Sequence, residues 1–174
     1  MLSGYYLAAR QLELLVGKKA NGPNTYSLGD ALGIAQHHDA VSGTAKQHTT
    51  YDYSKHLAIG VTESEAVVSS ALSCLTKKNL GRKCEDPPSI FSQCQLVNIS
   101  YCPQTEKDIP EGKSLVAVAY NPLAWNRTKI VRIPVNDDSF IVQDSSGNKI
   151  ETQYIALDNV TRNIRVFYTN IMQQ

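Results

Sequence analysis

The sequence predicts an α+β protein in which a helical bundle of about three helices is followed by part of an antiparallel β-sandwich. Up to about residue 80, apolar residues recur at helical spacing, whereas beyond residue 110 they alternate with polar residues in short runs. The segment between them is rich in Cys and Pro and has little regular pattern. We therefore expect three parts: a helical segment over residues 1–80, a connector over 81–110, and the beginning of a β-sandwich domain over 111–174.

The first two predicted helices have recognisable ends. Leucines form a broad apolar stripe within residues 5–19, and Gly17 followed by two lysines is typical of a helix C-terminus. Ser27 and Asp30 have the spacing of an N-terminal cap for a second helix. This second apolar run extends over residues 28–40 and so includes the most unusual stretch of the chain.

A third, longer helix is predicted after a Ser-Gly-Thr break. Thr44 and Gln47 have the spacing of a capping box at its start. Gly60, followed by a second cap-like pair at Thr62 and Glu65, indicates a kink or a restart within it.

The last part of the chain contains five short runs that are rich in β-branched and aromatic residues. Asn-Pro, Asp-Asp, Ser-Ser-Gly-Asn and Asp-Asn turns separate them. Strands at this spacing are typical of a β-sandwich. The predicted strands lie within residues 114–123, 127–135, 139–144, 149–157 and 163–170.

Composition narrows the class of protein. The chain has 174 residues, of which 42% are hydrophobic, and this is enough for a packed core. The formal charge is +1 without long runs of one sign, so nucleic acid and anionic lipid are disfavoured as partners. We expect no membrane span, because no apolar stretch approaches the roughly 18 residues required, and we see no targeting segment.

The four cysteines lie close together and are even in number. No Cys-x-x-Cys pair occurs, so disulfides fit better than a zinc site. We expect Cys94 to pair with Cys102, because eight residues between β-prone flanks can close a hairpin-like loop, and Cys74 to pair with Cys84 by default. The alternative is buried free thiols in a cytosolic protein.

Three acceptor sequons favour the secretory pathway. They begin at Asn98, Asn126 and Asn159, all in the second half of the chain. We expect a glycan on at least one of them. Together with the cysteines, they would place the protein in the lumen of that pathway or outside the cell.

The stretch "AQHHDAVSGT" is the strongest candidate for a functional site. Adjacent residues on an α-helix diverge by about 100°, so His37 and His38 would not face one ion, and His48 would lie roughly 16 Å along the axis. The segment would then supply one imidazole, with the Asp39 carboxylate nearby, and most of any metal site would lie outside this chain. On spacing alone, a His pair that interacts with a helix dipole is the more ordinary explanation.

A longer match changes that balance. "QHHDAVSGTAKQH" followed by "YDYSKHLAIG" resembles the His-His-Asp segment of the glycoside hydrolase family 38 α-mannosidases. The Val-Ser-Gly-Thr form is similar to the lysosomal or vacuolar class. "GYYLAARQLELLVG", "FSQCQLVNISYC" and "AVAYNPLAWNR" resemble the same family in the same order, so the resemblance covers most of the chain. In that family a β/α catalytic domain precedes a helical bundle and β-domains.

The resemblance implies a role for two of the three residues. His38 would ligate one zinc ion that is shared with residues outside this chain, and Asp39 would bind hydroxyls of the mannose. The family's other ligands, a His-x-Asp pair and a further Asp, have no counterpart here, and neither do its nucleophile and general acid. His37 would pack beside the site or support a ligand.

The implied activity is hydrolysis of terminal α-mannose residues of N-glycan oligosaccharides, with retention of configuration. In such a reaction one carboxylate attacks the anomeric carbon and a second protonates the leaving oxygen. The partners would be the remaining chains or segments of the same enzyme and a mannose-containing oligosaccharide, in the lumen of a lysosome or vacuole. The alternative is a non-catalytic glycoprotein module that binds carbohydrate or a protein partner through its β-sandwich.

Overall fold

In the computed structural model, the chain folds into two compact units. The helical unit comprises residues 1–92 and 120–126, and the second unit comprises residues 93–119 and 127–174. Within them, the residues that the structure describes are 2–16, 22–76, 90–95, 97–136 and 138–172. The division predicted from the sequence, into a helical segment up to residue 80, a connector up to residue 110 and a third part beyond it, stays a prediction.

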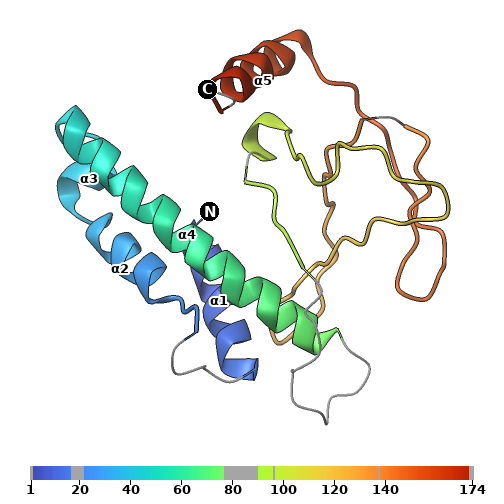
Figure 1. The fold of residues 1–174 in the computed structure, drawn as a ribbon, viewed down its shortest axis with the longest axis horizontal. Coiled ribbons are helices and arrows are strands. Elements are labelled where there is room, and N and C mark those ends of the chain that lie inside the picture. Colours follow the sequence, from blue (N-terminus) through green and yellow to red (C-terminus); the bar gives the residue numbers. More distant parts are fainter. Residues whose placement is uncertain (1, 17–21, 77–89, 96, 137, 173–174) are drawn as a thin grey trace. The chain divides into compact units, whose positions relative to one another are not determined.

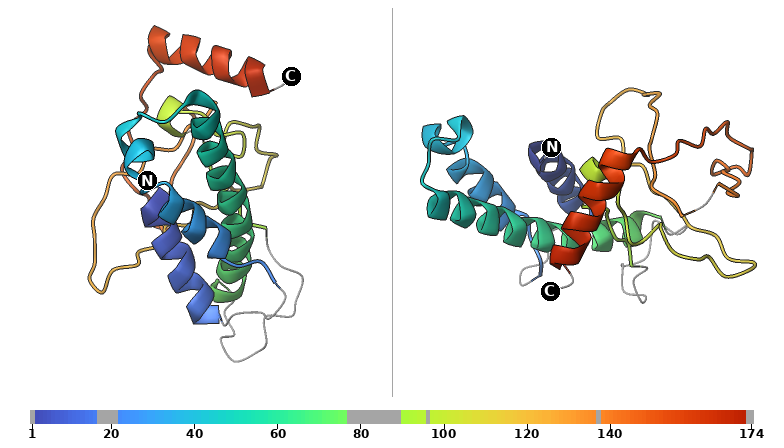
Figure 2. Two further views of the ribbon diagram at one scale, coloured as in Figure 1. Left: turned by 90° about the vertical axis from the view of Figure 1, so that its left-hand side faces the viewer. Right: turned by 90° about the horizontal axis from the view of Figure 1, so that it is seen from above.

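The described residues of the helical unit form four helices. They are α1 (Leu2–Val16), α2 (Tyr26–Ile34), α3 (His38–Ser42) and α4 (Gln47–Leu75). Helices α2 and α4 run antiparallel side by side, the short α3 lies at the turn between them, and α1 packs against both (Figures 1 and 2). The expected helical bundle is therefore present, with α3 as an additional short helix.

A stripe of small residues on α4 allows the other helices to approach it. Gly60, Ser64, Val67 and Ala71 are buried and recur at intervals of three or four, so they share one face. A Cβ atom on Gly60 would lie only 2.5 Å from the Cα atom of Leu28 in α2. The predicted restart at Gly60 is wrong, because α4 is continuous there. The glycine instead allows a close contact between helices.

Polar side chains also connect the helices. The spacing of Ser27 predicts a cap for α2, and this prediction is wrong. Its hydroxyl instead donates a hydrogen bond to Glu63 Oε2 of α4 over 2.6 Å. The hydroxyl of Thr25, before α2, donates to Glu13 Oε2 of α1 over 2.9 Å, and Arg10 contacts the same carboxylate at 3.0 Å. Glu13 is only 4% exposed, so these partners offset the cost of burying its charge.

The predicted β-sandwich is wrong. In the described residues of the second unit there is no strand, and the one β-bridge, between Gln143 and Lys149, is isolated. Around it the chain makes a single tight turn, in which Asp144 accepts hydrogen bonds from the backbone of Ser146 and Asn148. Alternating apolar residues predict two faces, but a strand also needs a neighbouring strand for its backbone hydrogen bonds, and that partner is not encoded in the local pattern.

A helix replaces the last predicted strand. Helix α5 spans Asn159–Met172 and contains the whole of the run 163–170. Asp158 precedes it and accepts hydrogen bonds from the backbone N–H and the hydroxyl of Thr161, at 2.9 and 2.7 Å. These bonds lower the pKa of the Asp158 carboxyl and cap the helix, which the alternation of apolar residues could not indicate.

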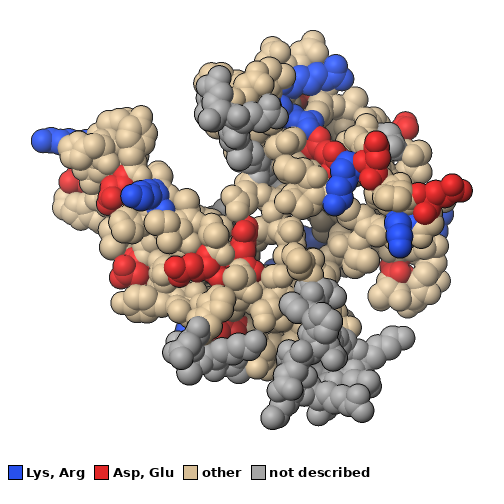
Figure 3. Space-filling view, viewed as in Figure 1, with Lys and Arg blue, Asp and Glu red and all other residues tan. Residues whose placement is uncertain are grey.

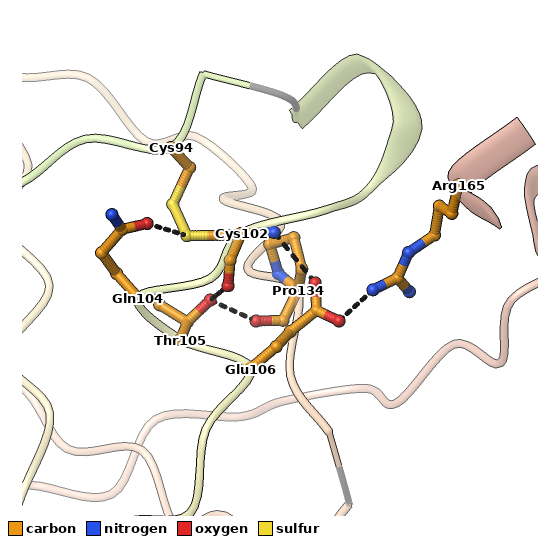
Figure 4. Close-up of a disulfide and its surroundings, with 7 residues drawn as sticks. All are labelled: Cys94, Cys102, Gln104, Thr105, Glu106, Pro134 and Arg165. Carbon is orange, nitrogen blue, oxygen red and sulfur yellow. Dashed lines mark hydrogen bonds and ion pairs between the residues drawn. A yellow bond between two sulfur atoms is a disulfide. The ribbon is translucent and has the colours of Figure 1, made fainter. Parts of the chain in front are cut away.

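A disulfide and an ion pair organise the second unit (Figure 4). Cys94 and Cys102 are bonded, with their Cα atoms 5.0 Å apart. Glu106 Oε1 accepts the backbone N–H of Cys102 over 2.9 Å, while Oε2 pairs with Arg165 of α5. The Arg165 guanidinium also lies 5.2 Å from the centroid of the Tyr101 ring. Together these contacts attach α5 to the disulfide loop.

Two further features belong to this region of the sequence. The 3₁₀ turn η1 (Val97–Ile99) lies inside the disulfide loop. Cys74, at the end of α4, is also disulfide-bonded, but its predicted partner Cys84 lies outside the described residues. No described helix is both long and apolar enough to cross a membrane.

Replacing Gly60 with Ala should destabilise the helical unit. The new methyl group would overlap the backbone of Leu28, so α2 must shift, and we expect a loss of about 1–3 kcal/mol in the free energy of unfolding. Gly33→Ala is the matched control, because a Cβ atom there meets nothing within 4 Å and alanine favours the helix. Urea unfolding followed by circular dichroism compares the two variants, and equal stability of both would contradict the close contact.

Peptide mapping under non-reducing conditions should recover Cys94 linked to Cys102. Their positions in the fold already satisfy the Cα separation of a disulfide. A Cys94 peptide linked to Cys84, or one that carries a free thiol, would contradict this pairing.

Candidate functional site

The His-His-Asp stretch lies at a break between two helices. Helix α2 ends at Ile34, and the backbone N–H of His37 closes the turn by donating to the Ile34 carbonyl over 3.0 Å. His37 then has an extended backbone, with φ −53° and ψ 138°, and α3 begins at His38. The single helix predicted over residues 28–40 is therefore wrong.

This break changes how the two imidazoles are oriented. Because His37 precedes the helix, the 100° divergence of adjacent helical residues does not apply to the pair. Nε2 of His37 lies 3.4 Å from Asp39 Oδ2, and Nε2 of His38 lies 3.7 Å from Asp39 Oδ1. The ring centroids are 4.3 Å apart. The predicted divergence of the two side chains on one continuous helix is thus wrong.

Three potential metal ligands consequently come together. Among the described residues, His37, His38 and Asp39 form a group whose ligand atoms all lie within 4.8 Å of one another. Imidazole nitrogen and carboxylate oxygen are both common zinc donors. The other two histidines are elsewhere: His56 contacts Asp52 on α4 at 3.6 Å, and His48 lies in the first turn of α4.

The turn after α3 holds the Asp39 carboxylate. Gly43 has φ +72°, a conformation that suits glycine, and it folds the chain back. The hydroxyl of Thr44 donates to Asp39 Oδ1 over 2.8 Å, and the hydroxyl of Ser42 lies 2.9 Å from that of Thr44. Thr44 therefore does not form the predicted capping box with Gln47, and α4 has no side-chain cap.

The end of the helical unit that carries these residues is open. The side chains of His37, His38 and Asp39 are 47%, 85% and 45% exposed, and no residue of α3 is buried. Large apolar side chains on α2, α3 and α4 are exposed as well, namely Ile34, Val41 and Tyr51. On the face drawn in Figure 3, basic and acidic side chains are interspersed.

The three sequon asparagines are all exposed, at different kinds of position. Asn98 lies in η1, Asn126 in the segment that belongs to the helical unit, and Asn159 at the first residue of α5. Exposure makes each side chain accessible to modification.

The helical segment is that of a known enzyme domain. Residues 2–75 match the model of the α-mannosidase middle domain. The chain is 66% identical over 169 residues to a protein of Arabidopsis thaliana named probable α-mannosidase, and 62% identical over 168 residues to an α-mannosidase of Canavalia ensiformis. Each match covers 97% of this chain. A lysosomal α-mannosidase of Homo sapiens is 37% identical over 150 residues, or 83% of this chain.

These matches define the class of the fold as an α-mannosidase middle domain with its C-terminal continuation. The chain belongs to the α-mannosidases of glycoside hydrolase family 38, as its sequence resemblance indicates. It spans only 16%, 17% and 14% of the length of the three relatives named above.

Proposed function

We propose that this chain is part of a zinc-dependent, retaining exo-α-mannosidase that removes terminal α-mannose residues from N-glycan oligosaccharides. His38 would be one ligand of a single zinc ion, and Asp39 would bind mannose hydroxyls. The nucleophile, the general acid and the other zinc ligands would lie outside this chain. The observation that carries the proposal is the convergence of His38 and Asp39 within the matched middle domain.

The residues present fit part of a zinc site. A catalytic zinc commonly takes three protein ligands and keeps a position open for water or substrate. His38 offers an exposed imidazole whose Nε2 is not hydrogen-bonded to Asp39, since 3.7 Å is too long for a hydrogen bond. When bound, zinc would act as a Lewis acid toward oxygen atoms of the sugar.

Asp39 suits a different task. An ionised carboxylate only accepts hydrogen bonds, and the hydroxyls of a sugar can donate them. Thr44 occupies Oδ1, whereas Oδ2 faces His37 without a close hydrogen bond. Oδ2 of Asp39 is thus available to a substrate hydroxyl.

The open end of the helical unit supports a site that is shared with other segments of an enzyme. Exposed apolar residues such as Ile34, Val41 and Tyr51 lie on the helices that carry or flank the His-His-Asp turn. Large apolar side chains exposed at such a place are ones that a contact with further protein would cover. The remaining segments of the mannosidase are the partner that we propose for it.

We also propose that the protein acts in the lumen of a lysosome or vacuole. The sequons, the disulfides and the name of the human lysosomal relative support that location. A non-catalytic module that binds carbohydrate or a protein partner through a β-sandwich is not supported, because no strand occurs in the described residues.

Replacing His38 with Ala in the complete enzyme should remove zinc and, with it, mannosidase activity. The variant loses one of a small number of ligands, so metal affinity should fall steeply, and excess zinc should partly restore turnover. Metal analysis by mass spectrometry and hydrolysis of an aryl α-mannoside measure the two effects.

Two neighbouring variants serve as controls for His38. Asp39→Asn should keep zinc near the native level. The loss of transition-state stabilisation, calculated from the fall in kcat/KM, should be about 1.5–3 kcal/mol, which is the usual contribution of a hydrogen bond to a charged group. His37→Ala should also keep zinc. This is a sharp test because both imidazoles lie in the cluster: loss of zinc from His37→Ala but not from His38→Ala would reverse the assignment.

At least one of Asn98, Asn126 and Asn159 should carry a glycan in protein from its native source. All three side chains are exposed, so the folded unit would accommodate the sugar. Intact mass before and after enzymatic deglycosylation measures occupancy, and Asn→Gln variants identify the site. An unchanged mass would contradict the proposed luminal location.

A further inference from the structure

We propose that Thr44 is a positioning residue for Asp39 in the mannosidase site. This inference rests on the proposed function of Asp39 and adds to it a group that neither the sequence pattern nor the family resemblance assigns. It comes from the fold of the turn that follows α3.

The backbone of the turn brings Thr44 onto Asp39. The N–H groups of Gly43, Thr44 and Ala45 all point to the carbonyl oxygen of Asp39, the last two at 3.0 and 3.2 Å. The positive φ of Gly43 makes this reversal possible. Five residues beyond Asp39, the side chain of Thr44 is thereby returned to the carboxylate.

The side chains complete this arrangement. Thr44 Oγ1 is 2.8 Å from Asp39 Oδ1, and since a carboxylate has no proton to give, Thr44 is the donor. The carboxylate therefore has two unlike oxygens, one held by Thr44 and the other facing His37 at 3.4 Å. Rotation of the carboxylate about its terminal bond is restrained, and Oδ2 keeps its direction.

Thr44 also binds the Asp39 oxygen that lies nearer to the proposed zinc ligand. With Oδ1 bound to Thr44, the distance from Oδ1 to His38 Nε2 is 3.7 Å, and no hydrogen bond forms. Without the hydroxyl, the carboxylate is free to rotate and its two oxygens become equivalent. A substrate hydroxyl would then have to order Asp39 at the expense of binding free energy.

The decisive variants are Thr44→Val and Thr44→Ser in the complete enzyme. Valine keeps the branched shape and removes the donor, whereas serine keeps the donor. We expect Thr44→Val to weaken binding of a mannose-configured iminosugar, and to lower kcat/KM for an aryl α-mannoside, by roughly two- to tenfold. Thr44→Ser should restore most of both, and zinc content should be native in each variant.

A second background shows whether Thr44 acts through Asp39. In Asp39→Ala, the further change Thr44→Val should have no additional effect on iminosugar binding, because the group that it positions is gone. Thr50→Val is the matched control: its hydroxyl donates to the Lys46 carbonyl in the first turn of α4, away from Asp39, and its loss should leave binding native.

The outcomes separate this proposal from the proposed function. The role of Thr44 would be overturned if Thr44→Val bound the iminosugar as the native enzyme does, or if it lost zinc. It would also be overturned if Thr44→Ser failed to restore binding, or if Thr44→Val had an equal effect in the Asp39→Ala background. Retention of zinc by His38→Ala would instead overturn the metal assignment, which the Thr44 variants do not test.

Discussion

The close contact between α2 and α4 at Gly60 is the constraint on which the rest of the helical unit depends. The backbone of Leu28 fills the space that a side chain at Gly60 would take, so the two helices approach closely only with glycine there. This contact fixes the start of α2 against the middle of α4. Because α2 and α4 run antiparallel, it also determines that the connection from Ile34 to Gln47 is a compact turn at one end of the unit. The His-His-Asp residues occupy that turn.

Polar bonds fix the register that close packing permits. The Ser27 hydroxyl reaches Glu63 across the same pair of helices, and Thr25 connects the start of α2 to Glu13 in α1. Such bonds are directional, whereas a stripe of small residues allows helices to slide and rotate. In the second unit, the Cys94–Cys102 disulfide and the Glu106–Arg165 ion pair attach α5 instead.

The sequence predicts the helical part well because its apolar stripes are long and periodic. It predicts contacts between helices poorly: Gly60 and Ser27 have local interpretations, as a restart and a cap, that their tertiary partners override. In residues 111–174 the alternation is real, but strands require pairing that no single segment encodes, and Asp158 favours a helix over the run that follows it.

The family resemblance assigns His38 and Asp39, whereas only the structure brings Thr44 to them. An Asp followed five residues later by Thr, with Gly between, is a signal that could have suggested this turn.

The interruption of the helix at His37 explains why this stretch suits a metal and sugar site. In a continuous helix, consecutive side chains point in different directions and a carboxylate cannot lie between two adjacent imidazoles. An extended His37 followed by a short helix places one imidazole on either oxygen of Asp39, and the left-handed Gly43 then returns Thr44 to the same carboxylate. Each departure from helical geometry thus adds one group around Asp39. Ordering this irregular turn is entropically unfavourable, and the packing of α2 against α4 at Gly60 offsets that loss because it fixes the two helices that the turn connects.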